Sequence, residues 1–248
     1  MSRENNDNPR GLLLETLSWP QAENALAEKR VVVIPLGAAA KEHGPHLPLN
    51  TDALIAQWLA DQVRQRLPVL ITPLINASYY PAFSEYPGSI SLRVETARDM
   101  LVELCRSLAR HGPRNFYVLN TGVSTEHPLS MAQLVLQSEN IRLKYLRLSN
   151  AFAGLDATRF EQQYGSHADE NETSLMLHIA AQVVDMDKAV NDGAEGEGPL
   201  SRKRSKGSTW SESGVYGQAT LANPEKGKLV ADALLRCALK EIEALPRQ

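Results

Sequence analysis

Residues 31–36 read Val-Val-Val-Ile-Pro-Leu, and a helical pattern begins at Thr51 after a polar loop. A short run that is apolar at every position is typical of a strand buried on both faces of a parallel sheet. From Thr51 to Leu67, apolar residues recur at steps of three and four, which predicts an amphipathic helix with Thr51 as its N-cap. A strand, a loop and a helix in this order form the first half of a right-handed crossover.

The same alternation continues along the rest of the chain. Further strands are predicted at 69–72, 116–119 and 143–148, and further helices at 96–110, at 128–138, from about Glu172 and at 224–245. We therefore predict an α/β fold with a mostly parallel central sheet covered on both faces. Ligands bind at the carboxyl ends of the strands in such sheets, where the loops 38–52, 120–127 and 165–174 are expected.

The composition fits one soluble domain over residues 1–248. The chain has 26 Lys and Arg against 29 Asp and Glu, and 43% of its residues are hydrophobic, so it lacks the basic balance of a nucleic-acid-binding protein. No apolar run is long enough to span a membrane. Both cysteines lie in helical patterns, which is typical of free thiols in the cytoplasm. We expect residues 1–10 to be a disordered tail and residues 191–213 a flexible surface loop, with a binding element as the alternative for the loop.

The loop after the first strand holds the densest group of chemically useful side chains. Between Lys41 and Asp52 it carries Glu42, His43 and His46. Imidazole nitrogens and carboxylate oxygens together suit zinc, manganese or iron. The alternative is a polar loop in which His43 is a hydrogen-bonded histidine without a metal and Asp52 only begins a helix.

A second group spans residues 167–174 and precedes an apolar helix. Acidic residues at a helix start stabilise it by about 0.3–1 kcal/mol each, so Asp169, Glu170 and Glu172 each have a structural explanation. His167 lies just ahead of them, and a histidine beside carboxylates is a natural proton carrier. His178 falls in the apolar face of this helix, where we expect it to be packed.

With these motifs in view, the chain resembles the creatininase (creatinine amidohydrolase) family over nearly its whole length. The resemblance rests on Ile34–Gly37, His43–Leu49 with Asp52, Tyr86–Leu92, Glu172–Leu177, Val184–Ala189 and Gly214–Gly217. It implies a three-layer α/β/α sandwich, a homo-oligomer, and hydrolysis of amide or cyclic amide bonds in a small molecule with two metal ions. By position, it also implies that Asp52 bridges the metals, that His43 is a ligand and that His167 carries protons.

Three positions depart from the family pattern. Lys41 stands two places before His43, where the family has a glutamate, and Gly122 and Ser124 stand where two further ligands belong. We therefore expect at most one divalent metal (zinc or manganese), or none, with the ammonium of Lys41 in place of the other. The predicted ligands are His43, Asp52 and Glu42, and the candidates for replacement ligands are Glu42, His127 and Glu172.

The predicted function is metal-dependent hydrolysis of a non-peptide carbon–nitrogen bond in a small molecule. We expect His167, Lys41 and Glu172 to be catalytic, and Tyr79, Tyr80, Tyr86 and Ser124 to contact the substrate, although aromatic residues in such a loop also serve packing. Two alternatives stay open at this point. One is a member that has lost catalysis and acts as a small-molecule-binding or scaffold protein, and the other is a lysine-assisted reaction in the same pocket.

Overall fold

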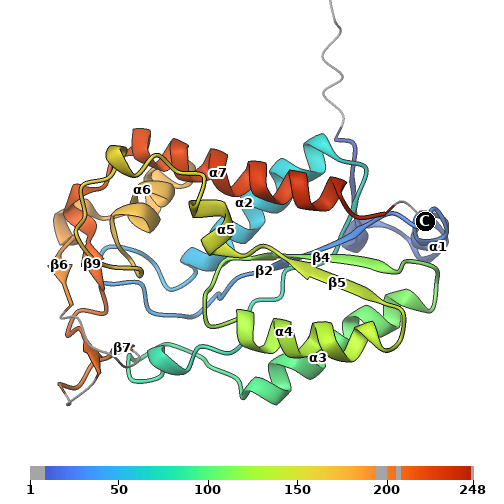
Figure 1. Ribbon diagram of the computed structural model, residues 1–248, viewed down its shortest axis with the longest axis horizontal. Helices are drawn as coiled ribbons and strands as arrows, with labels where there is room; N and C mark the ends of the chain where they lie inside the picture. Colours follow the sequence, from blue (N-terminus) through green and yellow to red (C-terminus); the bar gives the residue numbers. More distant parts are fainter. Residues whose placement is uncertain (1–8, 194–199, 205–207, 247–248) are drawn as a thin grey trace, which may run out of the picture.

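The computed structural model describes residues 9–193, 200–204 and 208–246. Its centre is a five-stranded sheet in which every pair of neighbouring strands is parallel (Figure 1). The strands lie in the order β1 (Leu12–Leu13), β3 (Leu70–Ile71), β2 (Val32–Leu36), β4 (Asn115–Asn120) and β5 (Arg142–Tyr145). The predicted α/β fold is confirmed, and the main sheet is parallel throughout.

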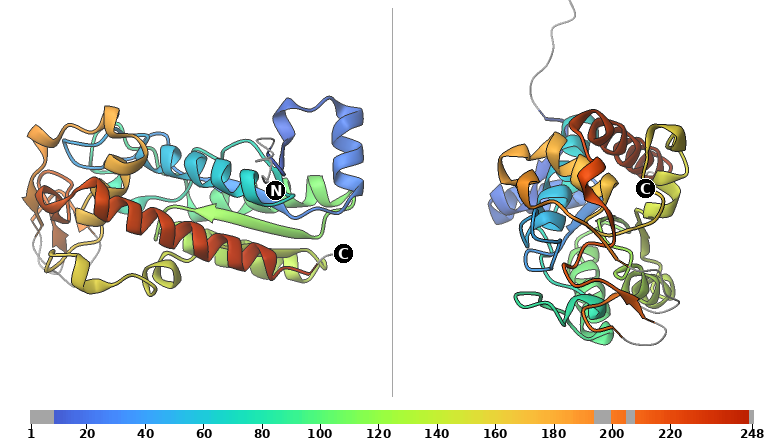
Figure 2. Two further views of the ribbon diagram at one scale, coloured as in Figure 1. Left: turned by 90° about the horizontal axis from the view of Figure 1, so that it is seen from above. Right: turned by 90° about the vertical axis from the view of Figure 1, so that its left-hand side faces the viewer.

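Helices cover both faces of this sheet, as Figures 1 and 2 show. One layer contains α2 (Thr51–Arg66), α5 (Leu148–Phe152), α6 (Glu170–Ile179) and α7 (Pro224–Glu243). The other contains α1 (Trp19–Ala27), α3 (Val94–Ala109) and α4 (Glu126–Gln137). Two small sheets lie outside these layers: β6 (Asn191–Asp192) pairs with β9 (Gly217–Gln218), and β7 (Leu200–Ser201) with β8 (Thr209–Trp210).

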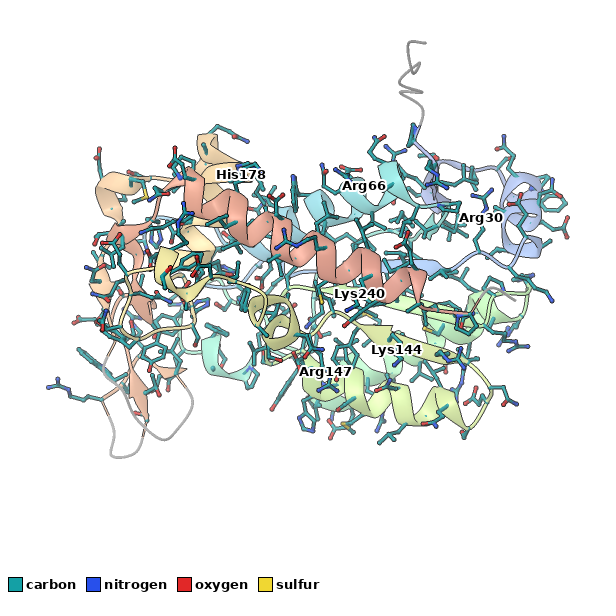
Figure 3. All side chains as sticks on the ribbon, turned by 45° about the horizontal axis from the view of Figure 1, so that its top comes forward. Arg30, Arg66, Lys144, Arg147, His178 and Lys240 are labelled. Carbon is teal, nitrogen blue, oxygen red and sulfur yellow. The ribbon has the colours of Figure 1, made fainter. Side chains whose placement is uncertain are left out.

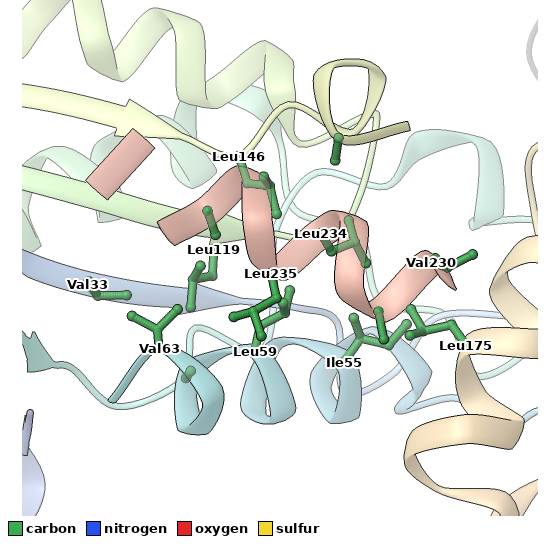
Figure 4. Packing of buried hydrophobic residues seen from close by; sticks show 14 of the residues in the cluster. Val33, Ile55, Leu59, Val63, Leu119, Leu146, Leu175, Val230, Leu234 and Leu235 are labelled. Carbon is green, nitrogen blue, oxygen red and sulfur yellow. The ribbon is translucent and has the colours of Figure 1, made fainter. Parts of the chain in front are cut away.

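The strands divide their side chains between two cores because successive residues point to opposite faces. On β2, Val33 packs with α2 and α7 while Val32 and Ile34 face α3 and α4. On β4, Tyr117 lies in the same core as Val33, and Phe116 lies in the same core as Val32 and Ile34. This explains the uniformly apolar sequence of β2, all of which is buried. Figure 4 shows the core beneath α7, where its leucines meet side chains from α2.

Several expectations about local structure are wrong. Asn50 occupies the N-cap position of α2, and Thr51 is the first helical residue, whose hydroxyl donates to the carbonyl of Pro48 at 2.8 Å. The predicted strand 143–148 ends at Tyr145, and α5 begins at Leu148. His178 is exposed on α6 and not packed (Figure 3). Neither β1 nor α1 was predicted.

The two segments expected to be disordered or flexible are described only in part. Residues 1–8 of the predicted tail lie outside the described residues, as do 194–199 and 205–207 of the predicted loop 191–213. The remainder of that loop contains β6, β7 and β8. Both cysteines are free, and Cys105 is buried. In the described part of the chain, no helix combines the length and apolarity needed to cross a bilayer.

The end of β2 is held close to the start of α2, and Gly37 makes this possible. A Cβ on Gly37 would overlap the backbone carbonyl of Asp52. Thr121, which follows β4, donates its hydroxyl to the carbonyl of Leu36 at 3.2 Å. The carboxyl ends of β2 and β4 therefore meet at the first turn of α2, where Asp52 lies.

Candidate functional site

A buried ion pair lies at this junction. The Nζ of Lys41 lies 2.7 Å from Oδ2 of Asp52, and the side chains are 5% and 1% exposed. Burial alone would raise the pKa of Asp52, but the charges of Lys41 and His43 outweigh it and hold that pKa well below its usual range. Burial also acts to lower the pKa of Lys41. The negative charges of Asp52 and Glu172 outweigh burial, so that this pKa is raised. Both groups are therefore ionised at neutral pH.

His43 has an oxygen at each of its ring nitrogens. Nδ1 lies 2.9 Å from the backbone carbonyl of Lys41. Because a carbonyl can only accept, Nδ1 carries a proton, and the lone pair of the neutral ring falls on Nε2. That Nε2 lies 3.2 Å from Oδ1 of Asp52 and 3.7 Å from Oε1 of Glu172. Only a second proton or a bound cation makes this arrangement favourable.

His167 repeats this arrangement from the opposite side. Its Nε2 lies 3.0 Å from the carbonyl of Glu42 and 3.1 Å from the Glu42 carboxylate, so Nε2 donates and Nδ1 carries the lone pair of the neutral ring. Nδ1 lies 3.7 Å from Oε2 of Glu172. Burial lowers the pKa of His167, but the hydrogen bond to Glu42 and its charge outweigh burial and leave that pKa raised.

Two backbone segments hold Glu42 in place. The first is its own loop, where the Glu42 carboxylate accepts a hydrogen bond from the backbone N–H of Gly44. The second is the segment around Gly214, before the C-terminal helix. Gly214 has φ +91°, and a Cβ there would overlap the Glu42 carboxylate. His167 pairs with Tyr216 through an antiparallel bridge. The segment around Gly214 thus fixes both partners of the His167–Glu42 contact.

Among the described residues, His43, His167 and Glu172 form the group that could hold a metal ion. Each offers one ligand atom, and these atoms all lie within 4.8 Å of one another. The residues fit a metal because each imidazole donates its other N–H to a backbone carbonyl or carboxylate, as metal-binding histidines do. The charges are also compatible with a cation, because Lys41 pairs with Asp52 at 2.7 Å while the carboxylates of Glu42 and Glu172 face the two histidine rings at 3.1–3.7 Å.

Lys41 is enclosed on its other side by aromatic rings. Its Nζ lies 4.8 Å from the ring centre of Phe83 and 5.6 Å from that of Tyr80. Tyr80 is 1% exposed, and its ring lies beside Gly122, where the family pattern has a ligand side chain. Aromatic faces attract an ammonium group, so the rings and Asp52 together form a complete environment for the Lys41 cation.

The other predicted site residues lie in different places. Ser124 and Lys41 line the large cavity described below, whereas Tyr79, Tyr80 and Tyr86 are not among its lining residues. Tyr86 donates to the carbonyl of Ser211 at 2.7 Å, and the ring of Tyr79 meets that of the exposed His127. That these tyrosines contact a substrate stays a prediction.

His46 is not part of the metal-binding group. It is 1% exposed, and its Nε2 shares a hydrogen bond of 2.8 Å with the hydroxyl of Thr173. Burial is the main reason that the pKa of His46 falls to about 4. The ring is therefore neutral at neutral pH, and its role is to hold α6 through the contact with Thr173.

A cavity of about 600 Å³ opens beside the site. Its polar wall includes Lys41, Ser124, His167 and Glu172, and the ring of Phe83 lies 4.4 Å from that of His167. Apolar side chains from α2, α5, α6 and α7 form another part of the wall, and residues of the neighbouring loops and of β7 and β8 complete it. The helical residues of this wall could not be recognised as site residues from the sequence, because they follow the same apolar periodicity as ordinary core residues.

An α/β/α sandwich with histidines and carboxylates at the carboxyl end of its sheet is the class of protein defined so far. Comparison with known proteins identifies the family: the model described as creatinine amidohydrolase matches residues 15–242. The chain belongs to the creatininase family.

Its curated relatives differ in the activity for which they are named. Creatinine amidohydrolase of Pseudomonas putida is 24% identical over 249 residues, which cover 89% of this chain and 92% of that protein. Mycofactocin precursor peptide peptidase of Mycobacterium ulcerans is 31% identical, over 80% of this chain and 79% of that protein. The 3-dehydro-scyllo-inosose hydrolase of Thermotoga maritima is 25% identical, covering 92% and 82%.

Solved structures confirm the fold. A mutant creatininase complexed with creatine superimposes with a TM-score of 0.79 at 22% identity, covering 95% of this chain and 100% of that chain. A putative creatinine amidohydrolase from Bacteroides fragilis has a TM-score of 0.71 at 19% identity, covering 95% and 96%. Other creatininase structures are described as a manganese form and a Zn–Zn type.

Proposed function

We propose that the protein is a metal-dependent hydrolase of a non-peptide carbon–nitrogen bond, with one divalent ion, zinc or manganese, held by His43, His167 and Glu172. The observation that carries the proposal is the placement of the ring nitrogens. Nδ1 of His43 and Nε2 of His167 face oxygens of Lys41 and Glu42, which leaves Nε2 of His43 and Nδ1 of His167 each 3.7 Å from the carboxylate of Glu172. The names of the three relatives share hydrolysis and differ in substrate.

This ligand set differs from the one expected from the sequence. Asp52 is already paired with Lys41, and Glu42 holds the outer nitrogen of His167. We therefore assign both carboxylates to supporting roles. In this proposal His167 is a ligand, and this assignment replaces the catalytic proton-carrying role that the sequence predicts for it.

A bound divalent ion would polarise a carbonyl and activate water. The chain itself supplies a second positive charge, because Lys41 is among the residues that line the cavity and its pKa is raised. A fixed ammonium stabilises negative charge that develops on the oxygen of an attacked amide. The ring of Phe83 packs against His167, and Ser124 is a lining residue of the cavity that could contact the substrate.

The test is metal content and amide hydrolysis measured on the same preparations. We expect up to one equivalent of zinc or manganese per chain, with His43→Ala and Glu172→Gln losing both metal and hydrolysis. His127→Ala is the matched control, because His127 is exposed and outside the group, and it should keep both. Hydrolysis that survives chelation and His43→Ala would overturn the proposal.

The buried Lys41–Asp52 pair also favours a second candidate, a binding protein without catalysis. A site in which an ammonium already neutralises the central carboxylate is stable without any ion. In that case, the protein would bind small amides with unchanged affinity in the presence of a chelator and would hydrolyse none of them.

A further inference from the structure

The cavity beside the metal-binding group has an apolar half that the proposed reaction does not use. We call it the apolar arm and define it by Ile55, Leu59, Phe152, Leu175, Val230 and Leu234. These residues come from α2, α5, α6 and α7. Figure 4 shows Ile55, Leu175, Val230 and Leu234 in the apolar region around α7.

The residues that define the arm are buried, apart from the half-buried Phe152. Leu59 is fully buried, and Val230 and Leu234 are 1% and 2% exposed, yet all three line the cavity. Protein cores normally pack with few voids larger than a water molecule. An apolar cavity does not hold water well and binds apolar molecules instead. The arm is therefore suited to an apolar group that arrives with a ligand.

The charges of the cavity lie on its other wall. Among the described lining residues, the charged side chains are Lys41, Asp169 and Glu172, with His167 beside them. Asp169 already accepts from the backbone N–H groups of Asn171 and Glu172. A charged substituent placed in the arm would have no partner, and burial of an unpaired charge is strongly unfavourable.

Resting on the proposed function, we infer that the substrate is amphiphilic: its amide lies beside His43, His167 and Glu172, and an uncharged apolar group fills the arm. The cavity of about 600 Å³ falls within the range of sites that enclose a whole small molecule. The substrate class is therefore a carboxamide with an aliphatic or aromatic substituent, and not a compact polar ring.

The test measures the binding of butanamide, hexanamide and octanamide by calorimetry. We expect the affinity to rise about fourfold per methylene while the chain enters the arm. Hexanamide with a terminal carboxylate should bind at least roughly tenfold more weakly than hexanamide. A series that is flat with chain length, or a charged analogue that binds equally well, overturns the inference even without a variant.

Two substitutions on α7 locate the effect. Val230→Phe fills the arm and should remove the dependence on chain length. Leu239→Phe is the control, because Leu239 does not line the cavity, and it should keep the dependence. If both keep it, the apolar group binds elsewhere and the inference is wrong. Metal content and hydrolysis in the same samples separate the two proposals: a flat series with turnover refutes only the arm, and a steep series without metal or turnover refutes only the hydrolase.

Discussion

Replacing Lys41 with methionine tests whether its ammonium is the cation that makes buried Asp52 tolerable. Methionine keeps the length of the side chain and removes its charge. The two side chains are 5% and 1% exposed, so the loss leaves a buried carboxylate with only His43 beside it. Breaking such a pair costs about 3–5 kcal/mol, which corresponds to a fall in Tm of roughly 6–20 °C for a domain of this size.

The pH dependence gives the sign of the effect. In the native protein the pKa of Asp52 lies below its ordinary value of 3.8, so its stabilisation is present above that pH and is lost as the pH falls through the lower, folded-state pKa. In Lys41→Met, burial raises the pKa of Asp52, and only His43 acts to lower it. Protonation of Asp52 removes the buried negative charge and with it the cost of burying that charge. The stability difference between the two proteins should therefore shrink as the pH falls.

Urea unfolding of four proteins measures this prediction: the native chain, Lys41→Met, Asp52→Asn and the double variant. The double variant should recover most of the loss, because it leaves no unpaired charge. A cost below about 1 kcal/mol for Lys41→Met, as for an exposed ion pair, would refute the reasoning. So would a double variant that is no more stable than Lys41→Met.

Three further predictions concern the supporting residues and the core. Glu42→Gln removes the carboxylate behind His167 and should weaken metal binding by roughly 10–100-fold in calorimetry, while equal affinity would contradict the assigned ring orientation. Gly214→Ala forces a Cβ against Glu42 at a positive φ and should cost at least about 1–3 kcal/mol in urea unfolding together with a loss of metal affinity; a neutral change would show that Glu42 lies elsewhere. Phe116→Ala, at a fully buried position, should cost about 3–5 kcal/mol without altering metal affinity, and altered metal binding would show that the core and the site are coupled.

The central layer was predictable because its signals are local. The apolar run of β2 and the periodicity of α2 each lie within one element, and the structure has both within a residue of the predicted bounds. β1 has only two residues, too few to show a pattern, and it forms because it pairs with β3. The apolar residues at 146 and 148 extended the predicted strand 143–148 beyond the end of β5, and nothing in the local pattern marks the turn into α5.

The site was predictable as a set of residues but not as a set of contacts. Lys41 and Asp52 share one loop, and the sequence suggested their pairing. His167 and Glu42 are 125 positions apart and meet because Gly214 leaves room for the carboxylate. Which nitrogen of each histidine faces inward depends on these distant partners. For that reason, the sequence pointed to Asp52 and Glu42 as ligands and to Glu172 only as a candidate replacement, whereas the set that we propose from the geometry joins His167 and Glu172 to His43.

Anomalous scattering from a crystal grown with manganese would test the central claim most directly, because it counts the ions and locates them together. We expect one peak per chain, between His43, His167 and Glu172, with the Lys41 ammonium on Asp52. Two peaks bridged by Asp52, with Lys41 displaced from that carboxylate, would contradict the account.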